Sequence, residues 1–247
     1  MKDNSCPKIV VVIPTYNEKD NLESLTKAVF KQSFPGTLEM IVIDDNSPDG
    51  TGRIADDLAK TNQNIRVLHR QRKLGLGSAY ITGFGHALSS GADIVIQMDA
   101  DFSHEPSVIP GLINLVQSGA DLAIGSRYVT GGRLDVEWGW ARRLLSWWAN
   151  RVWISAVLGL PVRDATAGFR AWSASALERI GLAGIKANGY YFQIEMTFLA
   201  QEAGCKIVET PIYFRSRRQG RSKMDLRLQF EAAIGVLLLR WRRHSSR

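Results

Sequence analysis

The sequence predicts an α/β fold with a mostly parallel central sheet flanked by helices. Short apolar runs of strand length recur along the first half of the chain, and polar loops followed by helical spacing of apolar residues separate them. Strands and helices that alternate in this way form βαβ units, whose strands lie parallel in one sheet. The 247 residues are enough for one large α/β domain or two small ones.

Five runs in the first half predict strands, and the first is apolar throughout, as in a strand buried on both faces of a sheet. They cover residues 9–13, 40–43, 65–68, 94–98 and 122–127. Pro14 ends the first run, and helical spacing follows over about residues 21–32. Thr51 caps a helix after the second run, and the glycine-rich residues 74–78 lead into a helix that reaches about Ser90. The glycine spacing fits neither a dinucleotide-binding loop nor a P-loop, so a tight turn is an equal interpretation.

Composition and charge limit the kind of partner. The chain is 45% hydrophobic and 22% charged, as in a globular protein, and its net charge of +7 favours an anionic partner: nucleic acid, phospholipid or a phosphorylated substrate. The two cysteines, Cys6 and Cys205, have no metal-binding spacing and fit a reducing, cytoplasmic setting. We expect no signal peptide, and no apolar run reaches the roughly 20 residues of a membrane-spanning helix.

The second half contains two segments typical of helices that lie in a membrane interface. Residues 144–158 combine three tryptophans with few charges, and residues 226–243 place arginines after apolar positions at helical spacing. A core helix that uses Trp as bulk is the alternative for the first, and a solvated basic tail for the second. We expect one domain over residues 1–225 and an amphipathic basic helix or tail over 226–247.

Acidic residues follow the strands where open α/β sheets bind their ligands. Asp99 and Asp101 end the fourth predicted strand with one small residue between them, so both carboxylates can approach one hard cation and a diphosphate. Taken alone, a polar turn explains them equally well. Two further strand ends favour a site, because Tyr16 could pack against a base and the acidic Asp44 and Asp45 could accept hydrogen bonds from a base or ribose. His104 is a weaker candidate ligand, since hard cations prefer oxygen.

Four motifs in order resemble the family 2 glycosyltransferases, and within that family the short polyprenol-phosphate or dolichol-phosphate mannosyltransferases that lack transmembrane helices. They are residues 12–18, 44–50, 98–104 and 125–128, with residues 131–132, 164–170 and 220–223 behind them. The resemblance covers nearly the whole chain, from about Lys8 to Lys223. It implies a GT-A fold with a Rossmann-like sheet. It also implies transfer of mannose from GDP-mannose to a polyprenyl or dolichyl monophosphate, with inversion at the anomeric carbon.

The resemblance also implies roles for residues at matching positions. Donor contacts are implied for Pro14, Tyr16, Glu18, Ile43, Asp45, Asp99, Ala100, Asp101, Arg127, Arg217 and Lys223. A Mg2+ or Mn2+ ion is implied on Asp99 and Asp101, with Ser103 where some members carry a further ligand, Gln. Acceptor-phosphate contacts are implied for Arg142 and Ser146, with Arg143 as the alternative to Arg142. We expect Asp101, Arg127 and Arg217 to carry the chemistry.

The implied nucleophile is a phosphate oxygen that is already ionised near neutral pH, so no catalytic base is expected. The expected partners are the nucleotide sugar, the lipid acceptor and the cytoplasmic face of a membrane, where the chain would bind peripherally; a membrane-anchoring subunit is left open. The nearest rival is a UDP-glucose-dependent polyprenyl-phosphate glucosyltransferase. A nucleic-acid binder rests only on the basic C-terminal residues, and the acidic strand ends would repel a nucleic-acid backbone.

Overall fold

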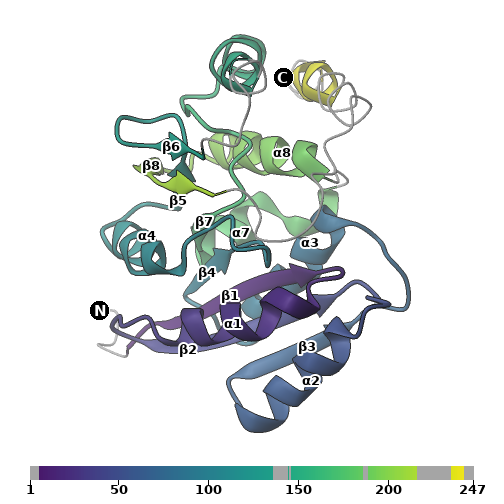
Figure 1. The fold of residues 1–247 in the computed structure, drawn as a ribbon. Helices are drawn as coiled ribbons and strands as arrows, with labels where there is room; N and C mark the ends of the chain where they lie inside the picture. Colours follow the sequence, from purple (N-terminus) through teal and green to yellow (C-terminus); the bar gives the residue numbers. More distant parts are fainter. Residues whose placement is uncertain (1–5, 136–143, 145, 186–188, 216–234, 242–247) are drawn as a thin grey trace.

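The computed structural model describes residues 6–135, 144, 146–185, 189–215 and 235–241. Its centre is a seven-stranded sheet with the order β3-β2-β1-β4-β7-β5-β8 (Figure 1). The strands are β1 (Lys8–Thr15), β2 (Thr37–Asp44), β3 (Ile65–His69), β4 (Ile94–Gln97), β5 (Leu122–Ser126), β7 (Arg170–Ser173) and β8 (Ile207–Pro211). All neighbours pair in parallel except β7, which runs antiparallel to both β4 and β5. The predicted mostly parallel α/β fold is confirmed.

Helices cover both faces of this sheet (Figure 1). One face packs on α1 (Lys19–Phe30), α2 (Thr51–Thr61) and α4 (Ile109–Gln117), and the other on α3 (Leu76–Ser89), α7 (Ala174–Ile180) and α8 (Gly189–Glu202). Along β1, Val10 and Val12 face the second group of helices, whereas Ile9, Val11 and Ile13 face the first. Burial on both faces explains why these strands read as unbroken apolar runs.

Strand register places the acidic segments together. β1 pairs with β2 as far as Thr15 opposite Asp44, and with β4 as far as Val12 opposite Gln97. The carboxyl ends of β1, β2 and β4 therefore meet at one edge of the sheet, as the sequence predicted.

β7 was not predicted, and it changes what lies beside the acidic strand ends. Because it is antiparallel to β4, its first residue, Arg170, lies opposite Gln97, the last residue of β4. Residues 164–169, which lead into β7, therefore reach the same edge as the aspartates that follow β4.

The remaining elements are short. β6 (Arg133–Leu134) and β9 (Tyr213–Phe214) form a parallel two-stranded sheet. The 3-10 helix η1 (Pro106–Val108) precedes α4, and the 3-10 helix η3 (Leu182–Gly184) follows α7. The tryptophan-rich segment is helical at its described positions, with a π-helical stretch η2 (Ala149–Ile154) before α6 (Ser155–Leu158). The predicted helix over residues 144–158 is thus present at the positions that the structure describes, and its backbone widens to π geometry over Ala149–Ile154.

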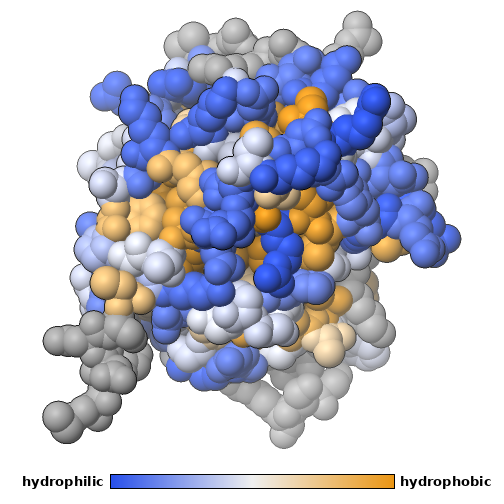
Figure 2. All heavy atoms as spheres, turned by 90° about the horizontal axis from the view of Figure 1, so that it is seen from below, coloured by the Kyte–Doolittle hydropathy of each residue, from blue (hydrophilic) through white to orange (hydrophobic). Residues whose placement is uncertain are grey.

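Residues 235–241 form a helix beside the tryptophan-rich segment, at the upper end of the molecule in Figure 1. A side-chain nitrogen of Arg240 donates to the carbonyl oxygen of Val157 at 2.9 Å, and Val236 and Leu239 are buried in the same core cluster as Ile154 and Leu158. Figure 2 shows the molecule from below, where hydrophilic side chains cover much of the surface and apolar ones appear between them. In the part of the chain described, no helix has the length and apolar character to cross a membrane.

Candidate active site

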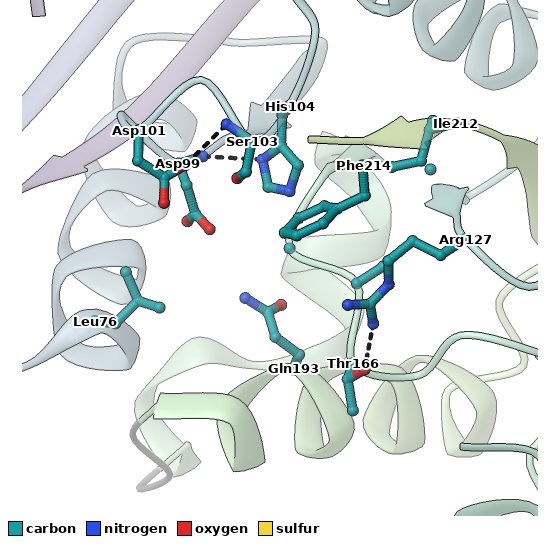
Figure 3. Close-up of a pocket in the computed structure, with 13 residues that line it drawn as sticks. Leu76, Asp99, Asp101, Ser103, His104, Arg127, Thr166, Gln193, Ile212 and Phe214 are labelled. Atoms are coloured by element: carbon teal, nitrogen blue, oxygen red, sulfur yellow. Dashed lines mark hydrogen bonds between the residues drawn. The ribbon is translucent and has the colours of Figure 1, made fainter. Parts of the chain in front are cut away.

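Two adjoining pockets open at the edge where the strands end, and both are lined by Leu76, Asp99 and Asp101. The first, the strand-end pocket, collects seven residues of the donor set expected from the sequence: Pro14, Tyr16, Glu18, Asp45, Asp99, Ala100 and Asp101. The second, the histidine pocket, lies toward β5 and α8 and includes Ser103, His104, Arg127, Thr166, Gly168 and Gln193 among its lining residues (Figure 3). The aspartate pair therefore stands at the junction of two pockets.

In the strand-end pocket, Asp45 organises the glycine-rich loop. Its two carboxylate oxygens accept the N–H groups of Leu74 at 2.9 Å and Gly75 at 3.0 Å, and Arg70 lies 2.7 Å from one of them. Gly75 has a φ of 96°, a conformation that suits glycine. The loop is thus a tight turn held by a strand-end carboxylate.

Tyr16 and Glu18 follow β1 on the other side of this pocket. The ammonium of Lys73 lies 3.6 Å from the centroid of the Tyr16 ring, which places a cation from the glycine-rich loop on an aromatic face. The backbone N–H of Glu18 donates to the Thr51 hydroxyl at 2.9 Å, and its carboxylate accepts from Asn21 at 2.8 Å. These bonds tie the loop after β1 to α1 and α2.

The last two residues of β2, Ile43 and Asp44, are buried. Ile43 has no exposed surface, packs in the core against Gly83 of α3 and does not line the strand-end pocket. Asp44 is also buried and accepts hydroxyl hydrogen bonds from Thr15 at 3.2 Å and Ser47 at 2.6 Å. Both residues therefore support the end of β2 from the protein interior.

Protein groups orient each aspartate at the junction. One oxygen of Asp99 accepts the Tyr80 hydroxyl at 2.7 Å, and one oxygen of Asp101 accepts the backbone N–H of Ser103 at 3.0 Å. Burial, followed by the charge of Asp99, raises the pKa of Tyr80 well above its ordinary value, so the phenol stays protonated and donates. Figure 3 shows both carboxylates directed into the pocket.

These carboxylates suit a hard divalent cation that also binds a substrate. Among the described residues, no group of three or more His, Cys, Asp or Glu side chains could hold a metal ion. Mg2+ commonly binds through one or two carboxylates together with substrate phosphates and water. The Ser103 hydroxyl is buried beside the pair and has no hydrogen-bond partner in this part of the structure, so it can serve a ligand oxygen. The donor set therefore fits Mg2+ or Mn2+ with a diphosphate completing the coordination.

The buried side chain of His104 lines the histidine pocket. Its Nδ1 accepts the backbone N–H of Asp99 at 3.3 Å, and its ring stacks on Phe169 with a centroid distance of 5.0 Å. Burial lowers its pKa, so the ring is neutral and its proton sits on Nε2. Because the Nδ1 lone pair is engaged, this nitrogen is unsuited to bind the cation.

Arg127 lies in the histidine pocket but is paired with Asp164. Its Nε donates to one oxygen of Asp164 at 2.7 Å and one terminal nitrogen to the other at 2.6 Å, and the same terminal nitrogen reaches the Thr166 hydroxyl at 2.6 Å. Burial opposes ionisation of Asp164, but the charge and hydrogen bonds of Arg127 outweigh it and lower the pKa of Asp164. The pair fixes the wall between β5 and β7.

Ser146 lies next to this wall. Its hydroxyl accepts from the hydroxyl of Tyr128 at 2.6 Å, and its carbonyl accepts from Asn150 at 3.0 Å, which in turn reaches Thr166 at 3.1 Å. The tryptophan-rich helix is thereby connected to the pocket. Arg142, Arg217 and Lys223, with the alternative Arg143, lie outside the described residues.

The sequence did not indicate Tyr80, Gln193 or Gly168 as part of the site. Gly168 lies in the motif at residues 164–170, and a Cβ there would come 3.3 Å from both an Asp99 oxygen and His104. Tyr80 and Gln193 sit on largely apolar helices, where a single polar residue gives no sign of what it faces. Only the fold brings them to Asp99.

Comparison with known proteins places this site in a family. Residues 10–181 match the sequence profile described as Glycosyl transferase family 2. Over 238 residues the chain is 43% identical to the undecaprenyl-phosphate mannosyltransferase of Micrococcus luteus, spanning 95% of this chain and 96% of that protein. It is 44% identical over 219 residues to the polyprenol monophosphomannose synthase of Mycolicibacterium smegmatis, spanning 88% of this chain and 81% of that protein.

The fold is also similar to that of a mannosyltransferase from Pyrobaculum calidifontis solved in complex with GDP-Man and Mn2+. The TM-score is 0.62 at 16% identity, over 99% of this chain and 66% of that one. This likeness concerns the fold and confirms the predicted GT-A architecture. The profile covers more than half of the chain, and the chain belongs to family 2 of the glycosyl transferases.

Proposed function

We propose that this glycosyltransferase moves mannose from a nucleotide sugar to a polyprenyl monophosphate. The observation that carries the proposal is the position of Asp99 and Asp101 at the junction of two pockets, one of which collects the residues expected to bind the nucleotide. The negative charge of a diphosphate that joins a nucleoside to a sugar must be neutralised between the nucleoside site and the sugar site. Two relatives above 40% identity, whose names specify mannose and a polyprenyl phosphate, support the choice of substrates.

The donor in this proposal is GDP-mannose, with the nucleoside in the strand-end pocket and the mannose in the histidine pocket. Tyr16 offers an aromatic face at the nucleoside end, and the solved protein of similar fold was captured with GDP-Man. The ionised acceptor oxygen attacks the anomeric carbon directly while the diphosphate departs. A single displacement of this kind inverts the anomeric configuration.

The residues of the chain would act by position and charge. Tyr80 holds Asp99 and the Ser103 backbone holds Asp101, so that both carboxylates keep their place during transfer. Mg2+ or Mn2+ bound between them would neutralise charge on the leaving diphosphate. Arg127 keeps the facing wall in place through Asp164. We propose that Arg217 and Lys223 neutralise donor phosphate and that Arg142, with Ser146, binds the acceptor phosphate.

The acceptor has a long apolar chain, and the proposal places the upper end of the molecule on the cytoplasmic face of a membrane. Trp147 and Trp148 are 44% and 46% exposed, and Trp241 on the neighbouring helix is 71% exposed. Tryptophan with arginine is typical of helices that lie in a membrane interface. Ser146 adjoins the first two tryptophans, so an acceptor phosphate held there would keep its chain toward the lipid. A membrane-anchoring subunit would add to this attachment.

A transfer assay with the full chain tests the proposal. The chain is mixed with liposomes that contain a polyprenyl monophosphate and with labelled GDP-mannose, and labelled UDP-glucose serves as the matched rival donor. We expect label in the lipid from GDP-mannose alone, its loss with EDTA, and its return with excess Mg2+ or Mn2+. Transfer from UDP-glucose and none from GDP-mannose would overturn the choice of donor.

A further inference from the structure

Gln193 is a buried glutamine of α8 that faces the histidine pocket with its amide. Its side chain is 3% exposed, and Figure 3 shows its amide nitrogen directed into the space beneath the aspartates. The amide nitrogen donates hydrogen bonds and the amide oxygen accepts them, so the end that faces the pocket decides which ligand groups it can bind. Here a chain of buried hydrogen bonds determines the orientation.

The chain begins at Trp172 of β7. Its indole N–H can only donate, and it donates to the side-chain oxygen of Gln97 at 3.2 Å. The nitrogen of Gln97 must then point the other way, where it donates to the side-chain oxygen of Gln193 at 2.7 Å. Because Trp172 and Gln97 are fully buried, no solvent competes for these groups. The orientation of both amides thus follows from one group that has no acceptor, and the nitrogen of Gln193 is left for the pocket.

The backbone of Gln193 is fixed as firmly as its amide. Its carbonyl oxygen accepts from Arg170 at 3.1 Å and from the Thr197 hydroxyl at 2.8 Å. Arg170 lies opposite Gln97 in the pairing of β7 with β4, so one pair of strands controls both ends of the residue. A donor held in this way is pre-organised for a ligand.

The position of Gly168 shows what the donor would meet. A Cβ on Gly168 would lie 3.7 Å from the amide nitrogen of Gln193 and 3.3 Å from an oxygen of Asp99. The Gln193 amide and the Asp99 carboxylate therefore both lie beside Gly168. The amide faces these carboxylates, which would hold the diphosphate, from the side away from the strand-end pocket. In the proposed reaction, the group bound there is the sugar.

We propose that Gln193 is a specificity-determining residue, whose amide N–H donates a hydrogen bond to one hydroxyl of the transferred sugar. Trp172 and Gln97 are positioning residues that keep the nitrogen, and not the oxygen, of Gln193 toward that hydroxyl. The inference rests on the proposed function and adds to it how the sugar is recognised.

Singly deoxygenated GDP-mannose donors test the contact. For the wild type we expect kcat/KM to fall about ten- to hundredfold for one deoxy donor, because the Gln193 N–H is then left buried and unpaired. In Gln193→Met, which has no donor, kcat/KM for GDP-mannose should fall by a similar factor, and removal of that same hydroxyl should cost nothing further. This non-additivity identifies a direct contact. Full deoxy penalties at every position in the Met variant would overturn the inference.

Trp172→Phe tests the positioning chain without touching the pocket. Phe keeps a six-membered aromatic ring but lacks the pyrrole ring with its N–H, so the two amides lose the group that orients them. We expect kcat/KM for GDP-mannose to fall and kcat/KM for the same deoxy donor to stay unchanged, so that the ratio between the two donors becomes smaller. A purely structural defect would lower kcat/KM for every donor by the same factor. Trp153→Phe is the matched control, because the Trp153 N–H is buried with no hydrogen-bond partner in the described structure, and its loss should leave all donor ratios unchanged.

The outcomes separate this inference from the function on which it rests. In one outcome the wild type transfers mannose, and Gln193→Met and Trp172→Phe show the same ratios of kcat/KM between donors as the wild type. That outcome contradicts only the role of Gln193. A wild-type chain that transfers no mannose contradicts both. If Gln193→Met does not fold, Trp172→Phe gives the same comparison, because it acts on the orientation of the Gln193 amide and leaves the pocket lining unchanged.

Discussion

At the scale of single residues, the candidate site depends on how firmly its two carboxylates are held. Asp99 is bonded by a side chain from α3, and Asp101 by the backbone of its own loop. Groups that orient metal ligands are expected to affect metal affinity and activity nearly as much as the ligands do.

Tyr80→Phe removes the hydroxyl that holds Asp99 and keeps the ring that stacks on Phe84 and Phe192. We expect the affinity for Mn2+ in the presence of GDP and the rate of transfer to fall about ten- to hundredfold, as for other partners of metal ligands. Titration of the chain with Mn2+ in the presence of GDP measures the affinity, and the transfer assay with GDP-mannose measures the rate. Tyr213→Phe, on the exposed β9, is the control and should change neither. An unchanged Mn2+ titration in Tyr80→Phe would show that the hydroxyl does not position Asp99.

At the scale of elements, the ion pair between Arg127 and Asp164 joins β5 to the segment before β7. The Asp164 side chain is fully buried and that of Arg127 is 6% exposed, so the pair is almost completely shielded from water. Asp164→Asn would leave the arginine charge buried with no counter-charge from this residue, and we expect a loss of about 3–5 kcal/mol in the free energy of unfolding. Urea denaturation at pH 7 measures it. A loss below 1 kcal/mol would mean that water reaches the arginine.

The same pair predicts how stability depends on pH. Because the folded state lowers the pKa of Asp164, the resulting stabilisation is fully present above about pH 3.9, the usual value for an unfolded aspartate. It is lost as the pH falls through the lower pKa of the folded state. Urea denaturation from pH 6 to pH 2 should show a smaller loss of stability for Asp164→Asn than for the wild type. Parallel curves would contradict this role for Asp164.

The two neighbouring helices at the upper end of the molecule should decide membrane binding. Trp241→Ser removes the most exposed of their tryptophans, and we expect weaker binding to anionic liposomes with little change in the melting temperature. Sedimentation with liposomes measures it. Ser substitution of Leu74, an exposed apolar residue in the glycine-rich loop, is the control for lost apolar surface elsewhere. Equal binding by the Trp241 variant and the wild type would place the membrane contact on another surface.

The sequence predicted the first five strands of the sheet, because most of their residues form short apolar runs. It missed β8, which pairs in parallel with β5. It also missed β7, since the four residues Arg170–Ser173 are short and mixed in character, and their partners lie far away along the chain. From their place at strand ends it predicted that the aspartates, Tyr16 and Asp45 lie together, and the structure brings them into one pocket. It could not identify Tyr80 or Gln193, because their position depends on how α3 and α8 pack against the sheet.

At the scale of the whole molecule, the structure connects the end that carries the exposed tryptophans to a charged site. The tryptophan-rich helix reaches the histidine pocket through Ser146, Tyr128 and Asn150, and the aspartates separate that pocket from the strand-end pocket. In this arrangement, an acceptor from the membrane and a donor from the cytoplasm would meet from opposite sides. The net charge of +7 would also favour an anionic membrane surface.

We propose above all that Asp99 and Asp101 handle the diphosphate of a nucleotide sugar, and Asp101→Ala tests this role most directly. The measurement is mannosyl transfer from GDP-mannose into polyprenyl phosphate at saturating Mg2+ or Mn2+, with the melting temperature as the check on folding. We predict that transfer falls by about three orders of magnitude or more while the melting temperature stays close to that of the wild type. A folded Asp101→Ala chain that transfers mannose at a near-normal rate would contradict the account.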